Sequence, residues 1–480
     1  MASCSVIEHA DIFIMLEFDG RLTDRLSSTD TLIAIFSPRA TIQRMLDVEA
    51  ALARALASAG VIPPEAVAPV EAACHPDQID AEALTRAAAR AGNLAIPLVK
   101  QLTAAVAQQA PDAAKYVHWG ATSQDIIDTG LVLQLRDALA LIEAQLASLD
   151  EALAGLAQRY RTTPMVGRTW LQQALPITLG MKFAQWLDTL ERHRTRVAQL
   201  RQNALALQFG GAAGTLASLG ERAEAVAAAL ARELALPLPA LPWHTQRDRV
   251  AEIATTLGLI TGTLGKIARD VSLQMQTEIG ELAEPSGAGK GGSSTMPHKR
   301  NPVGCAAVLS AAVRVPGLVA TVLAAMVQEH ERALGGWQAE WDALPEIARL
   351  CGGALANVEE IARGLEVDTG RLAANLGSTN GLILAEAVML ALGESMGRQA
   401  AHQLVEHASR EAVASGRSLR DVLAANSEVT SRLDAARLDA LFDPAHYAGR
   451  AHAFTDAVLE AFRASRANET AQINRGQESK

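Results

Sequence analysis

Residues 131–158 read LVLQLRDALALIEAQLASLDEALAGLAQ, and their apolar residues recur at alternating spacings of three and four. The stripe comprises Val132, Leu135, Leu139, Ile142, Leu146, Leu149, Leu153 and Leu156. Only a helix places such positions on one face, and a stripe sustained for this length is a seam against other helices. The same spacing returns from Val250 to Val271. The two stretches therefore predict a bundle of long helices.

The composition of the 480-residue chain supports an all-α fold. Hydrophobic residues make up 49% of the chain and aromatic residues only 4%, a balance unlike that of a β-sandwich. No alternating strand pattern recurs along the chain. At about 150 residues per domain, the length suggests about three domains. We expect three helical domains, at residues 1–120, 121–370 and 371–480, the second holding the central bundle.

Charge and cysteine content exclude several classes of partner and compartment. The net charge of −10 argues against nucleic acid or an anionic membrane as the main partner. No uninterrupted apolar run approaches the roughly 18 residues of a membrane span, and the first residues lack the basic start of a signal peptide. The four cysteines form no CxxC pair. We therefore expect a cytoplasmic protein without a membrane partner.

The densest motif is PSGAGKGGSSTMPHKRNP at residues 285–302. Its glycines satisfy GxGxxG, but a helical seam and not a strand precedes them, so a dinucleotide site is not predicted. A flexible glycine stretch that delivers two serines suits a lid that closes over a substrate. The alternative is that this segment is an ordinary polar loop between domains, with no role in catalysis.

Charge is distributed unevenly around this motif. From Pro285 to Gln328 the acidic chain contains no Asp or Glu, but it keeps Lys290, Lys299, Arg300 and Arg314. A cationic segment of this length predicts a small polyanionic ligand. Cations and backbone amides around a desolvated serine also make its alkoxide more accessible.

The segment GSSTMPHKRNP, residues 292–302, resembles the signature of the fumarase/aspartase superfamily, whose members eliminate groups from carboxylated substrates or add them. Two further blocks agree in order and spacing: HWGATSQD at residues 118–125 and GRTWLQQA at residues 167–174. The resemblance runs from about Ile33 to about Phe462. It implies a fold of helical domains around a long-helix bundle, and a homotetramer whose active sites each draw on three subunits.

The resemblance also implies roles for individual residues. Ser293 corresponds to the serine that exchanges the β-carbon proton, and His118 to an active-site histidine. Carboxylate binding is implied for Lys299, Asn301, Thr122 and Ser123. Arg168 and Arg300 either assist or form structural ion pairs, and Trp170 shapes the pocket wall. The implied ligand is a small polycarboxylate, with neither a metal nor a cofactor.

Two departures from adenylosuccinate lyase, a member that protonates a departing nitrogen, refine the expected chemistry. Trp170 stands where that lyase has its acidic histidine, and Ala306 stands where it has the supporting glutamate. A carboxylate, with a pKa near ~4, attacks or departs without a proton. The sequence WQAEWDALPEI at residues 337–347 is similar to the corresponding block in the cycloisomerase branch of the superfamily, whose members lactonise muconates. We therefore expect a cofactor-independent intramolecular lactonisation.

Two alternatives remain open at this point. One is an adenylosuccinate lyase-like β-elimination that uses a replacement acid. The other is a non-catalytic helical scaffold, because a fold can be retained after its catalytic function has been lost. A scaffold, however, has no use for Ser293, Lys299 and Asn301 together.

Overall fold

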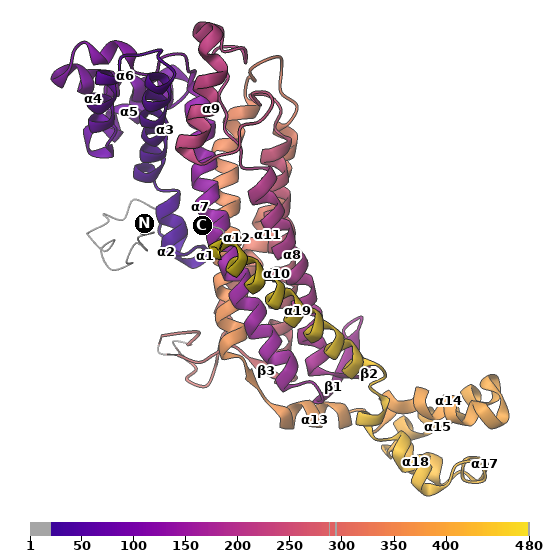
Figure 1. Cartoon of the computed structure of the whole chain (residues 1–480). Coiled ribbons are helices and arrows are strands. Elements are labelled where there is room, and N and C mark those ends of the chain that lie inside the picture. The colour runs from indigo at the N-terminus through magenta and orange to yellow at the C-terminus, as the bar shows by residue number, and fades with distance from the viewer. Residues whose placement is uncertain (1–20, 288, 293–294, 479–480) are drawn as a thin grey trace. The chain divides into compact units, whose positions relative to one another are not determined.

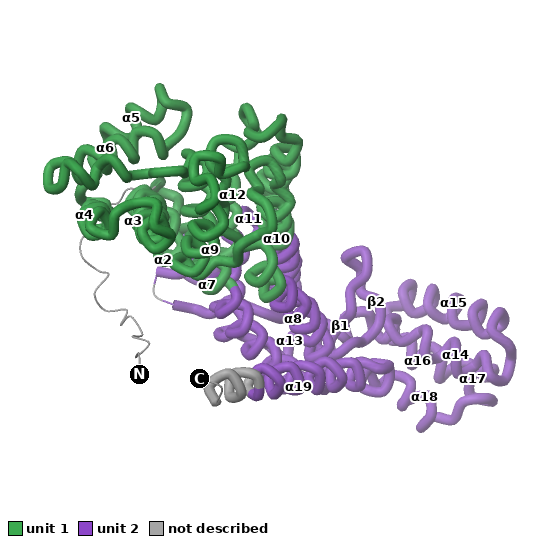
Figure 2. Tube along the Cα trace, turned by 45° about the horizontal axis from the view of Figure 1, so that its top comes forward, with its two compact units in different colours: residues 1–142, 197–258, 313–354 green, residues 143–196, 259–312, 355–480 purple. Residues whose placement is uncertain are grey.

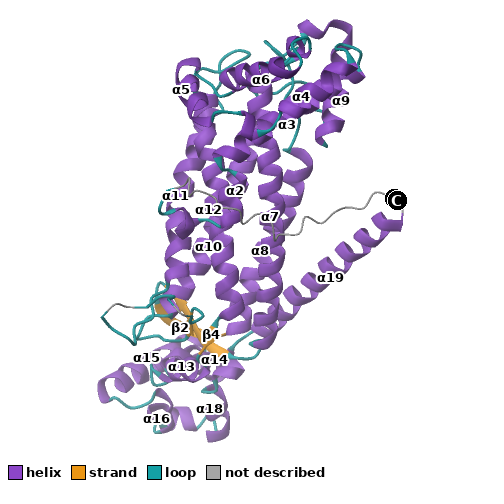
Figure 3. Cartoon of the chain, turned by 90° about the vertical axis from the view of Figure 1, so that its left-hand side faces the viewer, coloured by secondary structure: helices purple, strands orange, loops and turns teal. Residues whose placement is uncertain are grey.

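The computed structural model describes residues 21–287, 289–292 and 295–478, and helices dominate it (Figures 1 and 3). These ranges contain nineteen α-helices and four short strands. The predicted helical class is therefore confirmed.

Five long helices include the two that carry the predicted seams. They are α7 (Ser123–Arg159), α8 (Leu179–Asn203), α10 (Asp248–Gln274), α11 (Val303–Ala325) and α12 (Gly336–Gly364). The first heptad stripe lies on α7, where all of its residues are buried except Leu156, which is half-buried. Every position of the second stripe, on α10, is buried. The two stripes are therefore core, as their spacing predicts.

The chain forms two compact units, and the division falls inside each of these five helices (Figure 2). The first unit comprises Met1–Ile142, Val197–Gly258 and Val313–Ala354, and the second comprises Glu143–Arg196, Leu259–Ala312 and Leu355–Lys480. Within the second unit, a Cβ added at Gly265 of α10 would lie 2.7 Å from the Cβ of Ala312 on α11. This glycine thus permits close helix packing. The three-domain division at residues 120 and 370 stays a prediction.

The first unit adds shorter helices to its segments of the long ones. They are α1 (Asp24–Ser27), α2 (Asp30–Ile35), α3 (Pro38–Ser58), α4 (Val67–Ala73), α5 (Ala81–Ala91), α6 (Ala95–Gln109) and α9 (Ala223–Leu234), with 3-10 turns at Pro64–Ala66, Pro76–Gln78, Ala113–Tyr116 and Ala217–Arg222. The side chain of Ser37 caps α3 by accepting from the Ala40 N–H at 3.2 Å, and Pro38 occupies the first helical position. Helix α3 also carries the buried glutamate Glu49.

The second unit adds the C-terminal helices and all four strands. Its helices are α13 (Thr369–Gly377), α14 (Ala385–Met396), α15 (Arg398–Ser415), α16 (Leu419–Ala424), α17 (Ser427–Thr430), α18 (Ala435–Leu441) and α19 (Ala451–Glu478), with 3-10 turns at Leu382–Leu384 and Pro444–Tyr447. Helices α14 to α18 enclose a small core of their own, which includes Val388, Leu419 and Val429. Strands β3 (Leu282–Ala283) and β4 (Glu366–Val367) pair antiparallel just ahead of the glycine-rich loop.

A β-hairpin corrects the expectation that no strand occurs. Strands β1 (Pro164–Thr169) and β2 (Gln172–Thr178) pair antiparallel, with Thr169 opposite Gln172. The two residues between them, Trp170 and Leu171, have φ angles of 53° and 62°. A two-residue hairpin turn needs such positive angles, and Asn-Gly normally supplies them. The sequence Trp-Leu gives no turn signal, so a pattern search misses the hairpin.

Helix α11 is the most apolar long helix of the described chain. Its mean hydropathy over 18 residues is 1.9, but only 22% of that stretch is buried within the chain. By length and composition alone it could cross a membrane, as could the bent pair Thr369–Gly377 and Leu382–Met396 taken as one span. The polar residue Arg314 interrupts α11 and is ion-paired with Glu346 of α12.

Candidate active site

The site residues predicted from the sequence fall into three segments of the chain. They are His118, Thr122 and Ser123 in the first unit, and Arg168, Trp170, Lys299, Arg300 and Asn301 in the second. Ser293 lies outside the described residues. The segment with His118, Thr122 and Ser123 therefore lies in one unit. The β1–β2 hairpin and the loop before α11, which carry the other described site residues, lie together in the other unit.

His118 lies at a strained backbone position beside a buried carboxylate. Its φ angle is 61°, in the left-handed region that few residues other than glycine adopt. Its Nδ1 lies 2.6 Å from Oε1 of Glu49 on α3, and the Glu49 side chain is 1% exposed while that of His118 is 20% exposed. Burial opposes the charged ring, but the carboxylates of Glu49 and, more weakly, Asp125 outweigh it and raise the pKa of His118.

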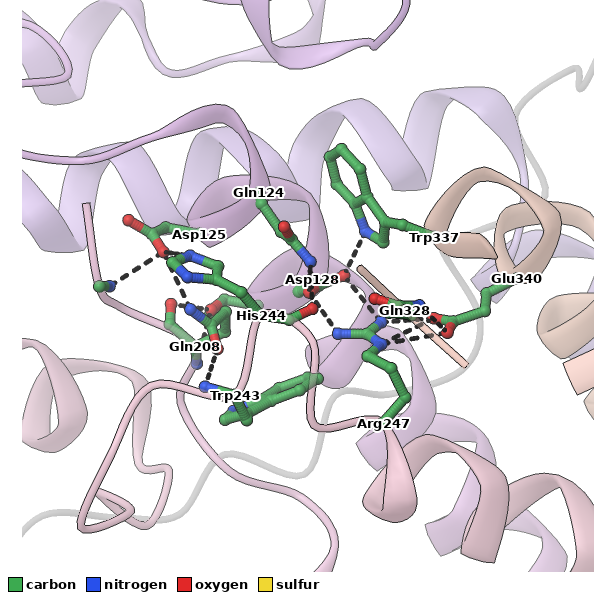
Figure 4. Close-up of polar contacts among 12 residues, drawn as sticks. Gln124, Asp125, Asp128, Gln208, Trp243, His244, Arg247, Gln328, Trp337 and Glu340 are labelled. Carbon is green, nitrogen blue, oxygen red and sulfur yellow. Dashed lines mark hydrogen bonds and ion pairs between the residues drawn. The ribbon is translucent and has the colours of Figure 1, made fainter. Parts of the chain in front are cut away.

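Asp125 ties the start of α7 to a distant glycine turn. Its 1%-exposed carboxylate accepts from backbone N–H groups and lies against two polar side chains (Figure 4). The partners are the N–H groups of Thr122 (3.0 Å), Gly210 (3.0 Å) and Gly211 (2.9 Å), the Gln208 amide (3.1 Å) and the His244 ring (2.9 Å). This network holds the backbone at Thr122 in place, and with it the start of α7 at Ser123.

A second buried network lies one helical turn further along α7. The Arg247 guanidinium donates to Asp128 at 2.7 and 3.2 Å and to both carboxylate oxygens of Glu340 on α12 (Figure 4). The Nε1–H of Trp337 donates to Asp128 at 2.9 Å, and the Trp243 ring lies 4.9 Å from the guanidinium carbon. Trp337 and Glu340 belong to the WQAEWDALPEI block, so part of that motif is structural.

The glycine-rich loop is anchored at its base by Glu366 of β4. Arg300 donates to the two Glu366 oxygens at 2.7 and 2.9 Å, and Ser286 donates to the same carboxylate through its N–H and its hydroxyl at 3.2 and 3.1 Å. Arg300, with further help from the two Ser286 hydrogen bonds, lowers the pKa of Glu366 to about 2. The two ends of the loop are thus joined through one carboxylate.

Helix α11 begins where this loop ends, and a buried carboxylate caps it. Glu284 accepts from the N–H groups of Gly304 at 3.0 Å and Cys305 at 2.7 Å, a favourable placement of negative charge at a helix N-terminus. Burial and the adjacent Glu284 raise the pKa of the Cys305 thiol, which disfavours a nucleophilic role. Just before the helix, the Asn301 N–H donates to the Gly291 carbonyl at 2.8 Å.

The hairpin contributes one ion-paired arginine and one exposed tryptophan. Arg168 forms a two-pronged pair with the fully buried Glu281 at 2.8 and 2.6 Å, and Asn375 also donates to Glu281 at 2.8 Å. Trp170, at the hairpin tip, is 98% exposed. Of the two roles left open for Arg168 and Arg300, ion pairing is therefore observed for both, and contact with a substrate stays a prediction.

The described site residues are mainly donors of hydrogen bonds and positive charge. His118, Lys299, Asn301 and the two hydroxyls of Thr122 and Ser123 suit carboxylate groups of a ligand. Within the described ranges, no cluster of three or more His, Cys, Asp or Glu side chains is arranged to hold a metal ion. The residues that sequence reasoning missed are Glu49, Asp125 and Arg247, whose partners are distant in the chain.

Comparison with known proteins defines the family. A family model described as "Lyase" matches residues 24–317, and one described as "Adenylosuccinate lyase C-terminus" matches residues 381–458. The 3-carboxy-cis,cis-muconate cycloisomerase of Pseudomonas aeruginosa is 58% identical over 426 residues, covering 89% of this chain and 93% of that protein. The chain therefore belongs to the fumarase/aspartase family of lyases.

Solved structures and other relatives place the chain within this family. The crystal structure of the 3-carboxy-cis,cis-muconate lactonizing enzyme from Pseudomonas putida has a TM-score of 0.88 and 54% identity, covering 92% of this chain and 98% of that one. The nitrosuccinate lyase of Streptomyces davaonensis is 43% identical, covering 89% of this chain and 91% of that protein. The relatives of this chain thus carry the names of different reactions on one fold.

Proposed function

We propose that the chain is a cofactor-independent 3-carboxy-cis,cis-muconate cycloisomerase, which interconverts 3-carboxymuconate and carboxymuconolactone, a step in the breakdown of aromatic acids. The observation that carries the proposal is 58% identity, over 89% of the chain, to a protein of that name. The exposed Trp170, in place of a protonating histidine, agrees with a reaction in which a carboxylate is the attacking or leaving group.

The reaction needs one proton and one new bond. A carboxylate oxygen of the substrate forms a C–O bond to a carbon of the conjugated double bond, and the π electrons move toward the neighbouring carboxylate as an aci-carboxylate. Protonation of the adjacent carbon then completes the lactone. The tricarboxylate has become a dicarboxylate lactone, so one proton is consumed overall.

The candidate residues divide these tasks. Ser293 supplies the proton to carbon. Lys299 and Asn301 stabilise the charge of the aci-carboxylate, because fixed donors directed at developing charge lower the barrier. Thr122 and Ser123 hold a second carboxylate.

Three further side chains complete the assignment. His118 donates a hydrogen bond to a substrate carboxylate, and Trp170 forms an apolar wall. Arg168 and Arg300 help through the ion pairs that hold the hairpin and the loop, with Glu281 and Glu366 as partners.

A diene assay tests the proposed function. The purified chain is mixed with 3-carboxy-cis,cis-muconate, and loss of the conjugated diene absorbance is followed. Adenylosuccinate and nitrosuccinate are tested separately as alternative substrates. Turnover of carboxymuconate is the expected result. Cleavage of adenylosuccinate without loss of diene absorbance would establish the β-elimination alternative, and no turnover of any of the three would favour the scaffold.

The role of Ser293 is tested by Ser293→Ala. General acid–base groups contribute about 10²- to 10⁴-fold, so kcat should fall by that factor. The matched control is Ser286→Ala, which removes a serine hydroxyl at the base of the same loop but only one of the donors to Glu366. Equal effects of the two changes would mean that Ser293 acts by holding the loop and not by proton transfer.

We also propose that the chain assembles as a cytoplasmic homotetramer whose sites combine residues of different copies. The apolar face of α11 supports this, because Val313 is 80% exposed, and Val327 just beyond the helix is 85% exposed. Cys74 and Cys305 are buried and unpaired, which suits a reducing compartment. Light scattering should give the mass of four chains, and Val313→Glu should reduce it. Mixing inactive Ser293→Ala and His118→Asn proteins should restore activity if sites are shared.

A further inference from the structure

We infer that Glu49 is a positioning residue that fixes the His118 ring with Nδ1 turned toward α3 and, as a buried anion, favours the imidazolium, whose Nε2–H is then the donor offered to a substrate carboxylate. The role of His118 as a carboxylate donor rests on the proposed function. The coupling between Glu49 and His118 does not, since it follows from the geometry of the first unit alone.

The burial of the two side chains assigns them different tasks. Glu49 is 1% exposed and cannot meet a ligand from solvent, whereas His118 is 20% exposed and can. The 2.6 Å contact joins Oε1 of Glu49 to Nδ1 of the ring. Because a carboxylate only accepts hydrogen bonds, Nδ1 must carry the proton. Any second proton then resides on Nε2, the nitrogen that Glu49 does not occupy.

The surroundings of Glu49 show that its charge has a specific partner. Along α3 its neighbours at helical spacing, Met45, Leu46, Leu52 and Ala53, are buried apolar residues. A carboxylate buried on such a face is costly unless it is paired and hydrogen-bonded. His118 provides the pairing, although it lies 69 residues away in the sequence.

Among the described residues, the two carboxylates that act on the His118 ring both favour its protonated form. Glu49 faces it from α3 and Asp125 acts from α7, and their carboxylates outweigh the burial of the ring and raise the pKa of His118. Beyond Glu49 lies the buried thiol of Cys74, whose pKa is raised by burial and then by Glu49. Asp125 is already engaged by backbone N–H groups and His244. Glu49 is thus the only carboxylate that touches the His118 ring among the described residues.

The direction of the pH effect follows from this arrangement. A raised pKa keeps the imidazolium present to higher pH, and the charge is lost as the pH rises through that value. Carboxylate binding by His118 should therefore persist to higher pH than the usual histidine pKa would allow, and weaken as the pH rises through the raised value. Without the Glu49 charge, the same loss should begin at lower pH.

Histidine-detected NMR measures this coupling without any assay of activity. The His118 ring signal is identified with His118→Asn and titrated in the wild type, in Glu49→Gln and in Glu49→Asp. The matched control is Asp47→Asn, which removes the same charge from the same helix, where Asp47 pairs with Arg44. We expect His118 to titrate above the usual histidine pKa in the wild type, lower in Glu49→Gln, and near the wild-type value in Glu49→Asp and Asp47→Asn.

A wild-type His118 that titrates at or below the usual pKa would overturn the inference even if Glu49→Gln failed to fold. So would an equal shift in Asp47→Asn and Glu49→Gln.

Kinetics then connect the coupling to the reaction. Loss of the partner that orients a metal-binding histidine typically costs about 10- to 100-fold. By the same reasoning Glu49→Gln should raise KM for carboxymuconate by about that factor at a pH between the His118 titration midpoints of the variant and the wild type, with a smaller change in kcat. The rise should diminish at a pH below both midpoints, and Glu49→Asp should restore much of the affinity. A pH-independent loss of kcat would contradict the positioning role. Normal NMR coupling in a protein that does not turn over carboxymuconate would instead disprove the proposed function alone.

Discussion

Replacing Arg247 with methionine should destabilise the first unit by about 3–5 kcal/mol, the cost of breaking a buried ion pair by removing one partner. Its guanidinium and the carboxylates of Asp128 and Glu340 are each 1% exposed. One cation balances part of the charge of two buried anions, so its removal leaves both carboxylates without a cation. The upper end of that range is therefore expected.

The matched control is Arg420→Met on the surface of the second unit. Arg420 and Asp439 approach to 2.7 Å, as Arg247 and Asp128 do, but their side chains are 38% and 57% exposed. An exposed pair contributes only about 0.2–1 kcal/mol. The two arginines approach an aspartate at the same distance, so the difference in stability between the variants reports mainly on burial and on the second buried carboxylate that Arg247 pairs with.

Urea unfolding followed by tryptophan fluorescence measures both variants, because Trp243 and Trp337 contact the Arg247 network directly. The loss in Arg247→Met should shrink as the pH falls, since the unpaired carboxylates become protonated more readily in the folded state than in the unfolded state. Adding Asp128→Asn and Glu340→Gln should recover part of the loss. Equal, small losses of below about 1 kcal/mol in Arg247→Met and Arg420→Met would refute the reasoning.

Three further predictions concern other buried and exposed positions. The Asp150 carboxylate accepts no hydrogen bond from the described residues. Burial, together with the nearby Glu191, raises the pKa of Asp150 to about 9. This carboxyl group therefore lowers the free energy of unfolding at alkaline pH, and that stability returns as the pH falls from about 9 toward about 4, at about 1.4 kcal/mol per pH unit. Asp150→Asn should raise the free energy of unfolding at pH 8 by a few kcal/mol and flatten this dependence, as urea titrations at several pH values would show. Asp125→Asn should lower the unfolding free energy by about 1–3 kcal/mol by leaving a buried donor unpaired, and should raise KM. Trp170→Ala should change stability by less than about 0.5 kcal/mol but raise KM for carboxymuconate, and an unchanged KM would remove Trp170 from the pocket wall.

The heptad stripes show why the long helices could be predicted. A seam of period 3.5 leaves a signal in every turn, and that signal depends only on residues three and four apart. Burial of Leu139, Leu146, Leu257 and Leu264 follows from this local rule. The hairpin was missed for the opposite reason. Its turn places Trp170 and Leu171 at positive φ, at a cost of about 1–2 kcal/mol per residue that the surrounding structure must offset.

The candidate site divides in the same way. The motifs predict His118, Thr122, Lys299 and Asn301 as site residues, because family resemblance acts residue by residue along short blocks, and their roles stay predictions. The roles of Arg168 and Arg300 were left open, and the structure shows each in a two-pronged ion pair. The partner carboxylates lie 113 and 66 residues further along the chain. No local pattern indicates such pairings.

The helical class, the seams on α7 and α10, the cationic segment after Pro285 and the family to which the motifs point can all be recognised in the amino-acid sequence. These features are local or cumulative, and periodicity, composition and short motifs record them directly. Which basic side chain each buried carboxylate meets depends on the tertiary structure: Glu49 meets His118, and Asp128 and Glu340 meet Arg247. The energy of a buried charge depends on its partner and its exposure, and both are set when distant segments fold together.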